Sequence, residues 1–130
     1  MKKIPTLYKR EFDTNGNKVP ISNEFTNEIC KEAFLYGIPT IKFDGSCCAV
    51  IDGKFYRRYD AKKGKPIPIG AIKCQEKADE ITGHLPCWVR VREDNPSDKW
   101  LIEALDNALK IEGGLLDGTY EAVGKHFNAN

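Results

Sequence analysis

Residues 47–59 read CCAVI-DG-KFYRRY, in which two short runs of β-forming residues flank the pair Asp52-Gly53. An Asp-Gly pair is typical of a type I′ turn, because both central residues of that turn have a positive φ. The segment therefore predicts a β-hairpin, with strands at residues 47–51 and 55–59.

Two more strands are expected further along the chain. One is predicted at residues 87–91, because Gly83 and Pro86 interrupt any regular element that precedes it. The stretch from Leu115 to Gly124 reads as a turn that leads into a last strand.

Two amphipathic helices are expected around these strands. The first spans residues 22–36, with Ser22 or Asn23 as its cap and Gly37 and Pro39 after its end. Its apolar face is formed by Phe25, Ile29, Ala33 and Phe34. The second runs from residue 97 or 98 to residue 110 and ends before Gly113-Gly114; its apolar face is formed by Trp100, Leu101, Leu105, Ala108 and Leu109. The elements predict an α+β fold, mainly an antiparallel sheet with flanking helices, in one domain over residues 1–130.

Charge is distributed unevenly along the chain. The formal net charge of all 130 residues is only +1. Residues 54–77, however, hold eight basic residues against two acidic ones, a local charge of +6. The same segment contains Phe55, Tyr56 and Tyr59. This combination suits a single-stranded nucleic acid, because the cations attract phosphates and the rings stack on bases. The alternative is a solvated hairpin face followed by a basic loop.

Several classes of protein are disfavoured. No apolar run is long enough to span a membrane and no signal-peptide core follows Met1, so a cytoplasmic location is expected. Cys74, His84 and Cys87 lack the spacing and the fourth ligand of a zinc site. Cys47 and Cys48 fit small core residues better than nucleophiles. Neither a P-loop nor a Rossmann glycine motif is present.

The segment IKFDGS, residues 41–46, is the most informative for chemistry. A lysine attacks phosphorus only when it is neutral, so Lys42 needs desolvation or nearby cations to act as a nucleophile. Ile41 and Phe43 are expected to desolvate it, and Lys62, Lys63 or a divalent metal to supply the positive charge. The alternative is an exposed strand lysine before an ordinary Asp-Gly-Ser turn.

Two motifs carry a resemblance to a known family. Residues 42–46, KFDGS, resemble the Lys-x-Asp-Gly-Ser/Thr signature of ATP-dependent ligases and capping enzymes, and residues 119–124, TYEAVG, resemble their third motif. The segments GHLPCWV, residues 83–89, and DKWLIEA, residues 98–104, are similar to a cellular RNA ligase family related to the phage tRNA-repair ligases. The resemblance covers roughly residues 40–128 and implies part of a nucleotidyltransferase adenylation domain, similar to ATP-grasp folds.

The resemblance implies an ATP-dependent RNA ligase that works in three steps. Lys42 would form a lysyl-adenylate from ATP with Mg²⁺, AMP would pass to an RNA 5′-phosphate, and an RNA 3′-hydroxyl would displace AMP. Nucleotide contacts are expected from Lys42, Asp44, Gly45, Arg58 (with Arg57 as the fallback) and Glu121. Glu121 is expected at the ribose or near a metal-bound water, and Tyr120 near the base. RNA contacts are expected from Lys62, Lys63 and Lys65.

The match is incomplete, and alternatives stay open. The family pattern continues with a Glu-Gly motif and a pair of lysines that have no counterpart here, so we expect an N-terminal fragment that is inactive in ligation by itself. Such a fragment is expected to expose a sheet edge through which it self-associates. A DNA ligase, a capping-type enzyme and a noncatalytic single-strand-binding module are the other functions considered.

Overall fold

The computed structural model describes residues 5–15, 19, 22–80 and 82–127. The chain divides into two compact units, Met1–Ile41 and Lys42–Asn130. Each is described by itself below, and the single domain expected from the sequence stays a prediction.

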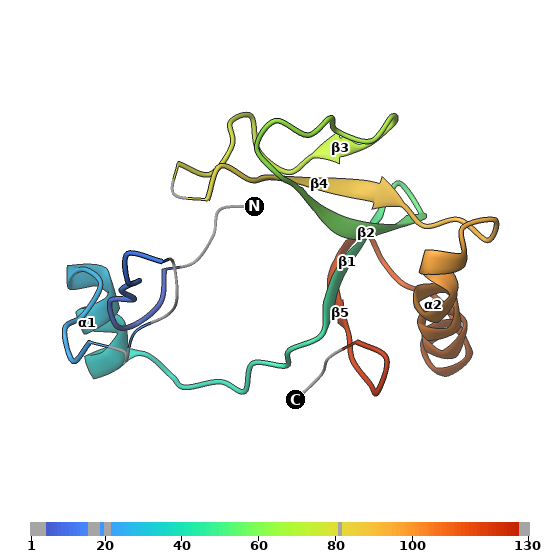
Figure 1. Cartoon of the computed structure of the whole chain (residues 1–130). Helices are drawn as coiled ribbons and strands as arrows, with labels where there is room; N and C mark the ends of the chain where they lie inside the picture. Colours follow the sequence, from blue (N-terminus) through green and yellow to red (C-terminus); the bar gives the residue numbers. More distant parts are fainter. Residues whose placement is uncertain (1–4, 16–18, 20–21, 81, 128–130) are drawn as a thin grey trace. The chain divides into compact units, whose positions relative to one another are not determined.

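The second unit is built on a five-stranded antiparallel sheet (Figure 1). Its strands, in the spatial order β3-β4-β2-β1-β5, are Ile72–Lys73, Leu85–Arg90, Lys54–Ala61, Ser46–Ile51 and Gly118–Ala122. One helix, α2, spans Lys99–Glu112 in this unit, and the other helix, α1, spans Glu28–Tyr36 in the first unit. The α+β class with a mainly antiparallel sheet is therefore confirmed.

The hairpin at the centre of the sheet forms as expected. Asp52 and Gly53 have φ values of 51° and 65°, as a type I′ turn requires. Both strands extend beyond the predicted limits, and β2 continues to Ala61. The short strand β3 was not expected, because its two residues are ordered by pairing with Cys87 and Trp88 of β4 and carry no pattern of their own.

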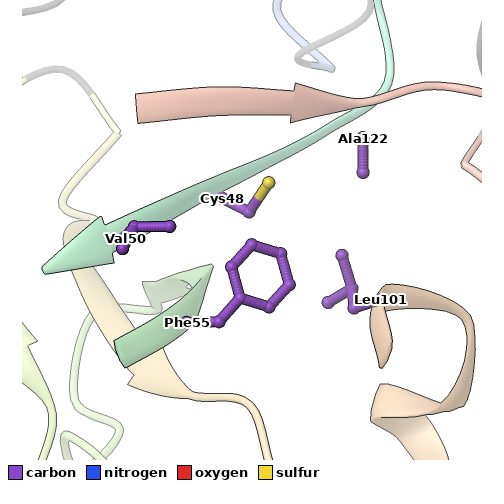
Figure 2. Packing of buried hydrophobic residues seen from close by; sticks show 5 residues of the cluster. All are labelled: Cys48, Val50, Phe55, Leu101 and Ala122. Carbon is purple, nitrogen blue, oxygen red and sulfur yellow. The ribbon is translucent and has the colours of Figure 1, made fainter. Parts of the chain in front are cut away.

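One face of the sheet forms the main hydrophobic core with α2. Cys48 and Val50 of β1, Phe55 of β2, Ala122 of β5 and Leu101 of α2 are all buried in one cluster (Figure 2). Burying side chains of this kind stabilises the fold by about 1.5–3 kcal/mol for each large apolar residue. Side chains alternate along a strand, so residues 47, 49 and 51 of β1 face the other side. There Ala49, Tyr56 and Trp88 form a second buried cluster.

The N-terminal end of α2 is anchored by a buried carboxylate. A 3₁₀ turn, η1 (Pro96–Asp98), precedes the helix, and the side chain of Asp98 is completely buried. Its Oδ2 accepts hydrogen bonds from the Arg92 N–H and the Asn95 amide. Its Oδ1 lies 2.7 Å from Arg57 Nε. The C-terminal end is closed by Gly113, which adopts the left-handed conformation and donates its N–H to the Leu109 carbonyl.

The first helix is shorter than the sequence pattern indicates. It begins at Glu28, not near residue 22, because Asn27 caps it by accepting a hydrogen bond from the Cys30 N–H. Phe25 is instead bridged to Tyr8 in an antiparallel pair, with the two rings stacked 5.2 Å apart. The expected apolar face is also wrong: Ile29 and Phe34 are exposed, and Cys30 is the buried residue of the helix. The predicted end at Gly37 is confirmed.

In the described part of the chain, no helix has the length and apolar character needed to cross a membrane.

Candidate functional site

The pairing of β1 with β5 brings the two ligase-like motifs together. Ser46 lies opposite Ala122, and Cys47 lies opposite Glu121. The backbone N–H of Gly45 donates a hydrogen bond of 3.0 Å to Glu121 Oε1, across 76 residues of sequence. The motif that contains Lys42 and the motif that contains Glu121 therefore form one local structure.

Gly45 is required by the approach of two backbones. A Cβ atom at this position would lie 2.2 Å from the carbonyl oxygen of Ala122 and 3.3 Å from Val123 Cγ1. The first distance is far below a van der Waals contact, so a side chain would force β1 and β5 apart. The close approach of β5 explains why residue 45 is a glycine. That Gly45 also leaves room for a nucleotide stays a prediction.

Lys42 is held in its charged form in this structure. Its side chain is 80% exposed, and Nζ donates a hydrogen bond of 2.9 Å to Asp44 Oδ1. That hydrogen bond and the charge of Asp44, with a further contribution from Glu121, raise the pKa of Lys42. The expected desolvation by its neighbours is wrong, because Ile41 is 83% exposed and Phe43 is 64% exposed. Residues 37–44 form no regular secondary structure, and these apolar side chains are in solvent.

Cys47 lies between Glu121 and Arg58 on the face of the sheet opposite α2. It pairs with Glu121 of β5, and its thiol interacts with the Arg58 side chain of β2. Burial and the charge of Glu121 raise the pKa of the Cys47 thiol, which favours the neutral form. Neither the sequence pattern nor the resemblance assigned Cys47 to this site. The alternation of β1 after Gly45 was the signal that could have placed it there.

Arg57 and Arg58 face opposite sides of β2. Arg58 Nε donates to Asp60 Oδ1 at 3.0 Å on the same face as Cys47, and its side chain is 37% exposed. Arg57 instead pairs with the buried Asp98 on the α2 side. The structure thus places Arg58 next to Cys47, on the face that also carries Glu121, and places Arg57 on the other face.

The other expected contacts lie outside this group. Tyr120 packs against the α2-side cluster, and its hydroxyl donates to the Leu116 carbonyl at 2.6 Å. It therefore lies on the face opposite Glu121, and its expected position near the base is not supported. Lys62, Lys63 and Lys65 are exposed in the turn that follows β2. Their contact with RNA stays a prediction.

Among the residues that the structure describes, no group of three or more His, Cys, Asp or Glu side chains is arranged to hold a metal ion. Mg²⁺ is usually held by one or two carboxylates together with substrate phosphates and water. The exposed carboxylates of Asp44 and Glu121, both close enough to affect Lys42, fit that kind of shared coordination.

Neither the protein-family models nor the curated proteins compared with this chain match it.

Proposed function

We propose that this chain carries the adenylation site of an ATP-dependent RNA ligase, with Lys42 as the nucleophile. The observation that supports this most is the hydrogen bond from Gly45 N–H to Glu121 Oε1. It joins the two segments whose sequences resemble nucleotidyltransferase motifs, although they are far apart in the chain. A chance likeness of two short motifs would not require them to meet in the fold.

In the first step, the amine of Lys42 attacks the α-phosphorus of ATP. A nitrogen–phosphorus bond forms, the bond from the α-phosphorus to the bridging oxygen of the β-phosphate breaks, and pyrophosphate leaves. Lys42 must lose a proton before it attacks, because the ammonium form has no lone pair. Asp44 is hydrogen-bonded to that ammonium group and is therefore placed to orient the lysine until the substrate separates the pair.

Arg58 and Glu121 lie on the same face of the sheet and have complementary roles in the proposal. The guanidinium of Arg58 offers planar N–H donors that suit a phosphate group. Glu121 accepts from Gly45 through one carboxylate oxygen, and the carboxylate has further acceptor capacity for a ribose hydroxyl or a metal-bound water. Mg²⁺, held by the carboxylates of Asp44 and Glu121 together with the phosphates, would neutralise charge on the phosphoryl oxygens.

The adenylate then passes to an RNA 5′-phosphate, whose oxygen attacks the phosphorus and releases the Lys42 amine. In the last step an RNA 3′-hydroxyl attacks the activated 5′-phosphate, and AMP leaves as the strand is joined. The exposed Lys62, Lys63 and Lys65 continue the positive charge of residues 54–77 and are the proposed contacts for RNA phosphates.

The test is covalent labelling of the purified chain with α-labelled ATP in the presence of Mg²⁺. We expect label to remain on the denatured wild-type protein and to be absent from Lys42→Ala. Lys110→Ala is the matched control, because it removes an exposed lysine from the last turn of α2 and should leave labelling intact. Equal labelling of the wild type and Lys42→Ala would contradict the proposal.

Substrate exchange then separates the related activities. Replacing ATP by GTP should abolish labelling, whereas a capping-type enzyme would keep it. Transfer of AMP to RNA 5′-phosphate ends in preference to DNA ends is expected, and the reverse preference would indicate a DNA ligase. RNA binding that is salt-sensitive, independent of ATP and unchanged in Lys42→Ala, with no labelling, would indicate a noncatalytic module.

A further inference from the structure

The start of β5 is tied to the central hairpin by a single carboxylate. Asp117, immediately before β5, accepts hydrogen bonds from two consecutive backbone N–H groups of the hairpin turn. The distances are 2.7 Å from Asp52 N to Oδ2 and 3.0 Å from Gly53 N to Oδ1. Two adjacent N–H groups in a turn with positive φ form a concave site that binds an anion. Here the anion is the side-chain carboxylate of Asp117.

This contact lies at the opposite end of β5 from Glu121. Strand β5 has only five residues, and it is an edge strand of the sheet, so it has a strand partner on one side alone. Its register places Gly118 opposite Val50 and Ala122 opposite Ser46. A shift of one residue would turn Glu121 to the α2 side and remove it from Gly45, because successive side chains face opposite sides of a sheet.

From these contacts we infer that Asp117 is a positioning residue that sets the β1–β5 register and thereby places Glu121 beside Gly45 and Lys42. A second contact supports the same end of the strand, because the Tyr120 hydroxyl is bonded to the Leu116 carbonyl. Asp117 does not belong to the resemblance-derived site. The catalytic consequence of this inference rests on the proposed adenylation at Lys42, whereas its structural part does not.

The register is tested first by NMR, without any activity. In the wild type, cross-strand NOEs are expected between Cys47 and Glu121 and between Ser46 and Ala122, because these residues are paired. In Asp117→Ala, which loses both acceptors, these NOEs should be lost or displaced by one residue in protein that is still folded. Asp117→Asn, which keeps one carbonyl oxygen as an acceptor, should retain part of their intensity. Glu112→Ala, which removes an exposed carboxylate from the end of α2, is the control and should retain all of it.

The second measurement is the rate of adenylation at saturating ATP. A displacement of about 1 Å in a catalytic group can cost on the order of a hundredfold in rate. We therefore expect Asp117→Ala to lower the rate at least about tenfold, with Asp117→Asn between it and the wild type.

Each outcome is decisive for one statement. Unchanged cross-strand NOEs in folded Asp117→Ala and Asp117→Asn would overturn the inference, even if both variants were less stable. If Asp117→Ala does not fold, Asp117→Asn carries the same test. If the wild type forms no adenylate while Asp117→Ala loses the wild-type cross-strand NOEs, the positioning role holds and the proposed function fails.

Discussion

Arg57 and Arg58 are adjacent in sequence, and their substitution should give opposite results. Arg57→Ala removes the cation that lies 2.7 Å from the fully buried Asp98. Removing one partner of a buried ion pair typically costs about 3–5 kcal/mol. We expect the lower end, about 3 kcal/mol, for three reasons. The Arg57 side chain is 27% exposed, and its contact with Asp98 lacks hydrogen-bond alignment. Asp98 also keeps its donors from Arg92 and Asn95.

Arg58→Ala should leave stability almost unchanged. Arg58 and Asp60, which form an ion pair, are both accessible to solvent, with 37% and 46% of their side chains exposed. Such pairs contribute about 0–1 kcal/mol. This substitution should instead lower ATP-dependent labelling, because Arg58 lies on the same face as Cys47 and Glu121.

Urea unfolding followed by tryptophan fluorescence measures the difference. With a slope of about 1–3 kcal/mol per molar urea, the loss for Arg57→Ala corresponds to a midpoint lower by roughly 1–3 M. Arg57→Lys, which keeps the charge but not the planar fork, should fall between Arg57→Ala and the wild type. The assignment of faces would be refuted if Arg58→Ala destabilised the protein as much as Arg57→Ala did.

Two further substitutions probe the junction of the motifs. Gly45→Ala should destabilise the protein by about 1–3 kcal/mol, because its Cβ would lie 2.2 Å from the Ala122 carbonyl oxygen; a thermal melt identical to wild type would show that the strands adjust without cost. Asp44→Asn should shift the alkaline rise of the adenylation rate to lower pH, because Asp44 raises the pKa of Lys42. A pH–rate profile that keeps its wild-type position would count against this role of Asp44.

The elements that the sequence predicts well are those fixed by local geometry. The Asp52-Gly53 turn and the helix end at Gly113 depend on residues that tolerate positive φ, and both form where expected. The start of α1 could not be located in this way, because Ser22 and Asn27 are both good caps. In the structure Asn27 is the cap, and Phe25, which lies before it, forms a bridge with Tyr8 and is not part of the helix.

The candidate site was predictable in its members and less so in its geometry. The motif residues Lys42, Asp44 and Glu121 lie close enough to interact. Which arginine of β2 shares a face with Cys47 and Glu121 depends on the side of the sheet that α2 covers, and this is a tertiary property. The hydrogen bonds of Asp117 to the hairpin turn link segments 65 and 64 residues apart, so no local pattern reveals them.

The most direct test of Lys42 as the nucleophile is the site of covalent modification. The chain is incubated with ATP and Mg²⁺, digested, and analysed by mass spectrometry for a peptide that carries AMP. We predict the modification on Lys42, with Arg58→Ala and Glu121→Ala reducing its yield. AMP on another lysine, or none on a folded wild-type chain that binds ATP, would contradict the assignment.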